Sequence, residues 1–192
     1  ETEVTAKMNE AFALDNAKKT AEALDVFLLV GRNTEQQRNE VEHQVYVCSQ
    51  TMACMCYETL ERYEEAYLLA KHLMAGGLTE KEKKDVGHLY AMNGYMYATS
   101  FMHGNNRQLV KARTILKEIM PYADGKVREY ALPKIPLSWY FEGAEYHLSQ
   151  QYDKALACYQ NALKGYIELG KTDDEISVLR HIAEIKETLY DV

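Results

Sequence analysis

Proline and tryptophan are scarce in this sequence, which has three prolines and one tryptophan among 192 residues. Because proline ends or bends helices, and because runs of β-branched residues are also few, the composition favours helix. No stretch approaches 18 uninterrupted apolar residues, and no apolar N-terminal segment leads to a small-residue cleavage site. The sequence therefore indicates neither a membrane-inserting segment nor an intact signal peptide. It begins at Glu1 without a methionine, so we expect a processed or trimmed piece, and export stays open.

Catalytic motifs are also missing. The sequence has no H-E-x-x-H, G-x-S-x-G, P-loop or G-x-G-x-x-G pattern, each of which positions groups for a particular chemistry. Its four cysteines form no C-x2-C pair, and Cys54 and Cys56 would point to different faces of a helix. We interpret them as buried thiols that act as small apolar side chains. We expect no enzymatic activity, no catalytic residue and no cofactor.

Two carboxylate–histidine pairs have a spacing that also occurs in metal sites. Glu40-x-x-His43 and Asp85-x-x-His88 have the carboxylate–histidine spacing of di-metal helical bundles, where two such pairs and two further carboxylates meet in the core. Acidic residues near helix starts are also favoured by the helix dipole alone. We adopt the second interpretation and expect no metal ligands.

The net charge of −7 disfavours nucleic acid as a partner. One locally basic region lies between residues 107 and 134, and we interpret it as a solvated helix face. Its cations are Arg107, Lys111, Arg113, Lys117, Lys126, Arg128 and Lys134.

Two amphipathic segments joined by a short polar turn stand out between residues 136 and 162. Two helices packed as a hairpin would give this pattern, because close approach needs small side chains on one partner and large ones beside them. The small and aromatic residues concerned are Trp139, Gly143 and Tyr146 in the first segment and Ala155, Tyr159 and Ala162 in the second.

This order, W-x3-G-x2-Y followed by A-x3-Y-x2-A, resembles the tetratricopeptide repeat (TPR), a helix–turn–helix unit. The resemblance implies an all-α fold, a right-handed α-α superhelix or TPR-like solenoid, with about four helical hairpins and a terminal helix. In such an array the first helices of successive hairpins line a concave wall.

The same elements recur along the whole chain. Small residues appear 40 to 49 positions apart, at Ala11, Cys54, Gly94, Gly143 and Ala183. An alanine follows each of the first four small residues. The spacing is 18 residues after Gly94 and 12 residues after each of the other three, which gives Ala23, Ala66, Ala112 and Ala155. We predict that each pair marks the closest approach of two helices in one hairpin.

We predict one TPR-like helical-repeat domain over residues 1–192, as a fragment of a longer chain. Its repeats are expected at about 4–31, 37–75, 80–120 and 136–169, with a half repeat at 172–191. Gly31 is expected to stop a helix, and three capping boxes are expected at Thr34 with Gln37, Thr79 with Glu82, and Thr172 with Glu175. Because the last helix has no partner, we expect the native chain to continue with further repeats.

The register predicts which side chains face the groove. Counting from the small residue of each first helix gives an aromatic and methionine-bearing surface that suits an adaptable contact with a peptide. The alternative interpretation of the same residues is packing between successive repeats. The candidate groove residues are Met8, Phe12, Thr51, Met55, Glu58, His88, Tyr95, Tyr140 and His147.

Repeats of about 40 residues are longer than the 34 of the simplest TPR. The longer form is similar to the N-terminal arrays of bacterial signalling and two-component sensor proteins. This resemblance implies a non-catalytic module that binds a protein or peptide, as the sensor or assembly part of a larger bacterial signalling protein. The alternative is a ligand- or peptide-responsive regulator that transmits a change in solenoid curvature. Self-association stays open, as does the location, periplasmic for an exported sensor segment and cytoplasmic otherwise.

Overall fold

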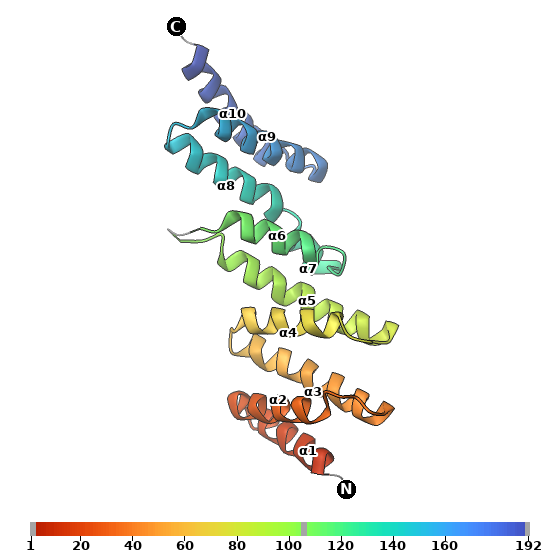
Figure 1. The fold of residues 1–192 in the computed structure, drawn as a ribbon. Helices are drawn as coiled ribbons and strands as arrows, with labels where there is room; N and C mark the ends of the chain where they lie inside the picture. Colours follow the sequence, from red (N-terminus) through yellow and green to blue (C-terminus); the bar gives the residue numbers. More distant parts are fainter. Residues whose placement is uncertain (1–2, 105–106, 191–192) are drawn as a thin grey trace. The chain divides into compact units, whose positions relative to one another are not determined.

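The computed structural model describes residues 3–104 and 107–190, which form ten α-helices and, within these ranges, no strand (Figure 1). Asn105, Asn106 and Asp191, which belong to the predicted third turn and half repeat, lie outside the described residues. The helices run Glu3–Asn16 (α1), Thr20–Thr34 (α2), Glu40–Thr59 (α3), Tyr63–Met74 (α4), Glu80–Ser100 (α5), Leu109–Ile119 (α6), Gly125–Ala131 (α7), Lys134–Leu148 (α8), Tyr152–Leu169 (α9) and Thr172–Tyr190 (α10).

The chain divides into two compact units, Glu1–Tyr97 and Ala98–Val192, with the division inside α5. The first unit contains the hairpins α1–α2 and α3–α4 and most of α5, and α2 also packs against α3. The second unit contains α6 to α10, in which α8 and α9 form a hairpin, α6 packs on α8, and α10 packs on α9.

Three hairpins turn in the same way. The turn residue lies seven positions after the small residue of the first helix and takes a positive φ: +59° at Lys18, +57° at Glu61 and +58° at Gln150. The residue after it donates its N–H to a carbonyl five positions back, at 2.9, 2.8 and 2.9 Å for Lys19, Arg62 and Gln151. An identical turn at equivalent positions identifies these hairpins as copies of one structural unit.

The predicted points of closest approach are buried. Ala11, Ala23, Cys54, Ala66, Ala112 and Ala155 are each 0% exposed, and Gly94 and Gly143 are buried as well. In the second hairpin the two predicted positions touch directly, because the Cys54 thiol donates to the Ala66 carbonyl at 3.8 Å. The fifth position, Ala183, is exposed on α10, and no described helix covers that side of it.

One of the three predicted capping boxes is present. Thr79 donates its backbone N–H to the Glu82 carboxylate at 2.8 Å, and Glu82 N–H donates to the Thr79 hydroxyl at 3.3 Å, so α5 starts as predicted. At the end of α9, Gly170 takes φ +63° and Lys171 N–H donates to the Tyr166 carbonyl at 3.0 Å. Glycine is suited to this left-handed helix end.

The predicted capping box of Thr34 and Gln37 is wrong. Thr34 is the last residue of α2, and its hydroxyl donates back to the Val30 carbonyl at 2.9 Å. The next helix begins at Glu40, where the Asn39 side chain accepts from Glu42 N–H at 2.9 Å. The last predicted box is not formed either, because α10 already begins at Thr172 and Glu175 N–H donates to the Lys171 carbonyl.

Gly31 does not stop α2, which continues to Thr34. It lies where α2 meets α3, and a Cβ at this position would come within 2.6 Å of the Gln50 Cδ. Gly31 therefore lies inside a helix and against the buried Gln50 side chain, an environment that a single sequence does not distinguish from a helix end.

Arg113 is not on a solvated helix face, which corrects the interpretation of the basic region at this residue. It is 5% exposed, its guanidinium lies 3.5 Å from the centroid of the Trp139 ring, and it forms an ion pair with Glu142. A second bond runs to the Ser138 hydroxyl at 3.4 Å. Arg113 thus fixes α6 on α8.

These features make the protein an all-α, TPR-like arrangement of helical hairpins, as predicted. Among the described residues, no helix has the length and apolar character needed to cross a bilayer.

Candidate functional site

A hollow of about 230 Å³ lies between α3 and α5 in the first unit. Three of the nine predicted groove residues, Met55, Glu58 and His88, line it together. We call it the α3–α5 hollow, and its lining residues are Met55, Glu58, Thr59, His88, Leu89 and Met92.

Helical spacing explains why these residues meet. Met55, Glu58 and Thr59 are three and four positions apart on α3, so they share one face, and His88 and Met92 are four apart on α5. Both helices are first helices in the predicted repeat scheme. The hollow therefore lies where successive first helices were expected to form a wall.

The α3–α5 hollow combines accessible apolar surface with one carboxylate. Met55 is 46% exposed on α3, a helix whose other face contributes to the core. Glu58 is half-buried, and no described basic residue forms an ion pair with it. Methionine side chains can adapt to different apolar partners, and the carboxylate favours a cation beside them.

Two further candidates flank the hollow without lining it. Thr51 lies one helical turn before Met55 on α3, and Tyr95 lies on α5 beyond Met92; both are half-buried. On each helix they continue the line of predicted groove residues beyond the hollow.

Met8 and Phe12 have a packing role in the structure. Met8 is 8% exposed and belongs to the core cluster of α1, α2 and α3. The Phe12 ring packs edge-on against Phe27 of α2, with centroids 5.4 Å apart. These contacts are those of core residues, and the Phe12 contact with Phe27 lies within the first hairpin rather than between successive repeats.

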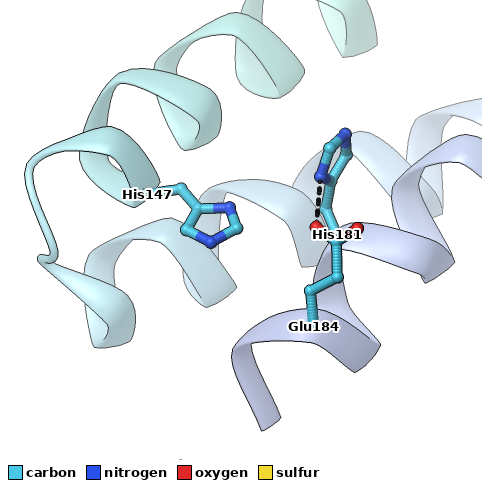
Figure 2. A group of neighbouring side chains, drawn as sticks. All are labelled: His147, His181 and Glu184. Atoms are coloured by element: carbon cyan, nitrogen blue, oxygen red, sulfur yellow. Dashed lines mark hydrogen bonds and ion pairs between the residues drawn. The ribbon is translucent and has the colours of Figure 1, made fainter. Parts of the chain in front are cut away.

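Tyr140 and His147 lie in the second unit, on the face of α8 that meets α10. The Tyr140 hydroxyl lies 3.0 Å from His181 Nε2, and His181 Nδ1 lies 3.1 Å from the Glu184 carboxylate. The His147 ring stands edge-on to the His181 ring at 6.1 Å (Figure 2). We call this group the α8–α10 cluster: Tyr140, His147, Tyr159, His181 and Glu184.

Tyr159 of α9 forms the floor of the α8–α10 cluster. It is 0% exposed, its ring stacks on His181 with an interplanar angle of 11°, and it also contacts the rings of Tyr140 and His147. Its hydroxyl has no hydrogen-bond partner among the described residues. Burial raises the pKa of Tyr159 to about 12, so the phenol stays protonated at neutral pH.

Sequence reasoning missed Thr59, Leu89 and Met92 of the hollow and His181 and Glu184 of the cluster. Leu89 and Met92 were within reach, because they lie one position after His88 and one helical turn after it on the same helix. His181 and Glu184 have a three-residue spacing on α10 that resembles the weighed Glu40–His43 pair, but in the reverse order.

The histidine of the first carboxylate–histidine pair, His43, contacts side chains other than Glu40. His43 Nε2 lies 3.2 Å from the Glu82 carboxylate, and its Nδ1 contacts the Gln37 side chain. In the described part of the chain, three potential metal ligands come together only at His147, His181 and Glu184.

Comparisons with known proteins give no family. No protein-family model matches the sequence, and no curated protein matches it. Two crystal structures of the nearly identical TPR-like repeats of a putative kinesin light chain from Podosopora anserina, one of them a substituted form, are similar to this chain. Both are 13% identical to it, cover 98% of it over 97% of their own length, and superpose with TM-scores of 0.43 and 0.42.

Proposed function

We propose that this protein is a non-catalytic module that binds a peptide segment of a partner protein in the α3–α5 hollow. The single observation that carries the proposal is the exposed Met55 beside Glu58, His88 and Met92 in a hollow between two first helices. Arrays of helical hairpins typically serve as scaffolds for protein contacts rather than as catalysts.

The lining of the hollow selects the chemistry of the partner. Met55, Leu89 and Met92 offer apolar surface for one buried side chain, while Glu58 offers a carboxylate beside it. A peptide with an apolar residue next to lysine or arginine would satisfy both. The net charge of −7 would also attract a basic segment at a distance.

A peptide selection tests the proposal. A phage-displayed library of random 12-residue peptides would be panned on the purified chain, and the enriched peptides measured by fluorescence anisotropy. We expect micromolar binders that contain an apolar residue beside a basic one. Met55→Glu should weaken them at least about tenfold, because a buried charge would face the apolar side chain.

The matched control is Leu68→Glu. Leu68 is 52% exposed on α4 in the same unit and does not line the hollow, so its substitution adds the same charge elsewhere. We expect it to leave the peptide affinity within about twofold, since surface changes away from a contact have small effects. Failure to enrich any peptide, or equal losses with both variants, would contradict the proposal.

The finer prediction, a sensor or assembly part of a larger bacterial signalling protein, stays a prediction that rests on repeat length. The alternative of a curvature-transmitting regulator also stays a prediction. Small-angle scattering with and without a selected peptide distinguishes the two, because only the regulator changes its radius of gyration on binding.

A further inference from the structure

Three side chains of metal-ligand type meet in the second unit. His147 of α8 and His181 and Glu184 of α10 each offer one ligand atom, and these atoms all lie within 4.8 Å of one another. Figure 2 shows His147 pointing from α8 toward the side of His181 that contacts Glu184. We propose that His147, His181 and Glu184 bind a divalent transition-metal ion such as Zn²⁺.

The kinds of donor atom identify the class of ion. Two imidazoles and one carboxylate suit zinc and its neighbours cobalt and nickel, whereas calcium and magnesium prefer shells of oxygen. Three protein ligands also leave a fourth tetrahedral position open. That position is available to water or to a carboxylate from a partner.

Only a small closure is needed to reach binding geometry. Ligand atoms about 2 Å from a tetrahedral zinc ion are about 3.3 Å apart, compared with the separations of up to 4.8 Å here. The Glu184 side chain is 59% exposed and that of His181 is 34% exposed. The Glu184 side chain therefore has room to rotate toward the two histidines, whereas His181 keeps the orientation that its neighbours give it.

Tyr140 provides the outer contact that orients a metal-binding histidine. Its hydroxyl lies 3.0 Å from His181 Nε2, while Nδ1 faces Glu184. An ion on Nδ1 leaves the ring proton on Nε2, which then donates to the Tyr140 hydroxyl. The Tyr159 ring, stacked on His181, holds the imidazole plane in place.

The ion would also join two helices. His147 belongs to α8, whereas His181 and Glu184 belong to α10, which otherwise packs mainly on α9. A bound ion would therefore fix the last described helix to the hairpin before it. This site is separate from the α3–α5 hollow, so either proposal can fail without the other.

The test uses the full chain with Cys48→Ser, which removes an exposed thiol that could compete for metal. After treatment with EDTA and buffer exchange, the protein is titrated with CoCl₂ by absorption and with ZnCl₂ by calorimetry. We expect one ion per chain with micromolar or tighter affinity. His147→Phe, His181→Phe and Glu184→Gln should each weaken binding at least about tenfold while keeping the side-chain volume similar.

Two further measurements separate binding from general stability. His72→Phe, at an exposed histidine of α4, should leave the affinity unchanged. Zn²⁺ should slow hydrogen exchange of the α10 amides in the parent chain and not in His147→Phe, whose metal-free circular dichroism should match the parent. Absence of saturable micromolar binding, or binding that survives both histidine substitutions, would overturn the proposal.

Discussion

Gly143 of α8 lies directly against the ring of Tyr159 on α9, where a Cβ would come 2.9 Å from Cδ1 and Cε1 of the ring. The missing side chain lets the two helices of the hairpin approach, and the aromatic ring fills the space beside the contact. Tyr159 in turn supports His181 of α10. One glycine therefore sets both the hairpin crossing and the position of the α8–α10 cluster.

Gly143→Ala should destabilise the protein by about 1–3 kcal/mol, because overpacking at the crossing outweighs the gain of up to about 1 kcal/mol in helix propensity. Urea unfolding followed by circular dichroism measures the change. Gly77→Ala is the control, since a Cβ there meets nothing within 4 Å, and it should stay within about 0.5 kcal/mol of the parent. Equal stabilities of the two variants would show that the crossing is looser than described.

Gln150 takes φ +58° at the turn between α8 and α9, a conformation that costs a residue with a side chain about 1–2 kcal/mol. Gln150→Gly should therefore raise the free energy of unfolding, with part of the gain offset by the greater freedom of glycine in the unfolded chain. The neighbour Gln151 has φ −88°, so Gln151→Gly gains nothing and should destabilise. Glu61→Gly should likewise be more stable to unfolding than Arg62→Gly. A reversed order of stability at either turn would contradict the shared turn geometry.

Arg113→Ala should cost about 3–5 kcal/mol, because it leaves the half-buried Glu142 without its partner and removes the guanidinium from the Trp139 ring. The double variant Arg113→Met with Glu142→Leu should recover most of the loss, since no buried charge then remains. Lys117→Ala, at an exposed site of the same helix, should be near neutral. Thermal and urea unfolding of the four proteins measure these differences, and a mild effect of Arg113→Ala alone would mean that the site is solvated.

Alkylation should distinguish Cys48 from the other three cysteines. Cys48 is exposed, whereas burial raises the pKa of Cys54 to about 12 and those of Cys56 and Cys158 to about 11. A raised pKa means less thiolate at pH 8, and the thiolate is the form that reacts. Intact mass spectrometry after iodoacetamide treatment should find one label in the native chain and four in urea. The rate at Cys48 should rise with pH, because partial burial raises its pKa too. Rapid multiple labelling without urea would contradict the buried positions.

The helical hairpins could be predicted because their requirements are local. The small residue of a first helix and the alanine 12 positions later lie on the two helices of one hairpin, separated only by its short turn. Cys54 and Ala66 are therefore brought together by the hairpin alone. The same locality explains the correct capping box at Thr79 and Glu82.

Other features depended on contacts between distant segments. Gly31 has the appearance of a helix end in the sequence, and only the structure places it inside α2 beside the Gln50 side chain. In the sequence Arg113 cannot be distinguished from the other basic residues of its region. Its burial depends on contacts with Trp139 and Glu142 of α8. The α8–α10 cluster likewise required the packing of α10, which brings His181 to Tyr140 across 41 positions of sequence.

Only three of the nine predicted groove residues lie together, between partly exposed faces of two helices. Met55, Glu58 and His88 line one hollow, whereas Met8 is buried and Tyr140 contacts another helix. The repeat register predicts the direction in which a side chain points from its helix axis. The burial of that side chain depends on how much of it the next helix covers. This coverage differs between the first hairpin, where Met8 is 8% exposed, and the second, where Met55 is 46% exposed.

Methyl resonances of the methionines test the peptide-binding surface most directly. With ¹³C-methyl-methionine in the full chain, a selected 12-residue peptide should shift the Met55 and Met92 signals, which line the α3–α5 hollow, and leave that of the buried Met8 unchanged. Saturable peptide binding that leaves Met55 and Met92 unmoved while other methyl signals shift would contradict the account.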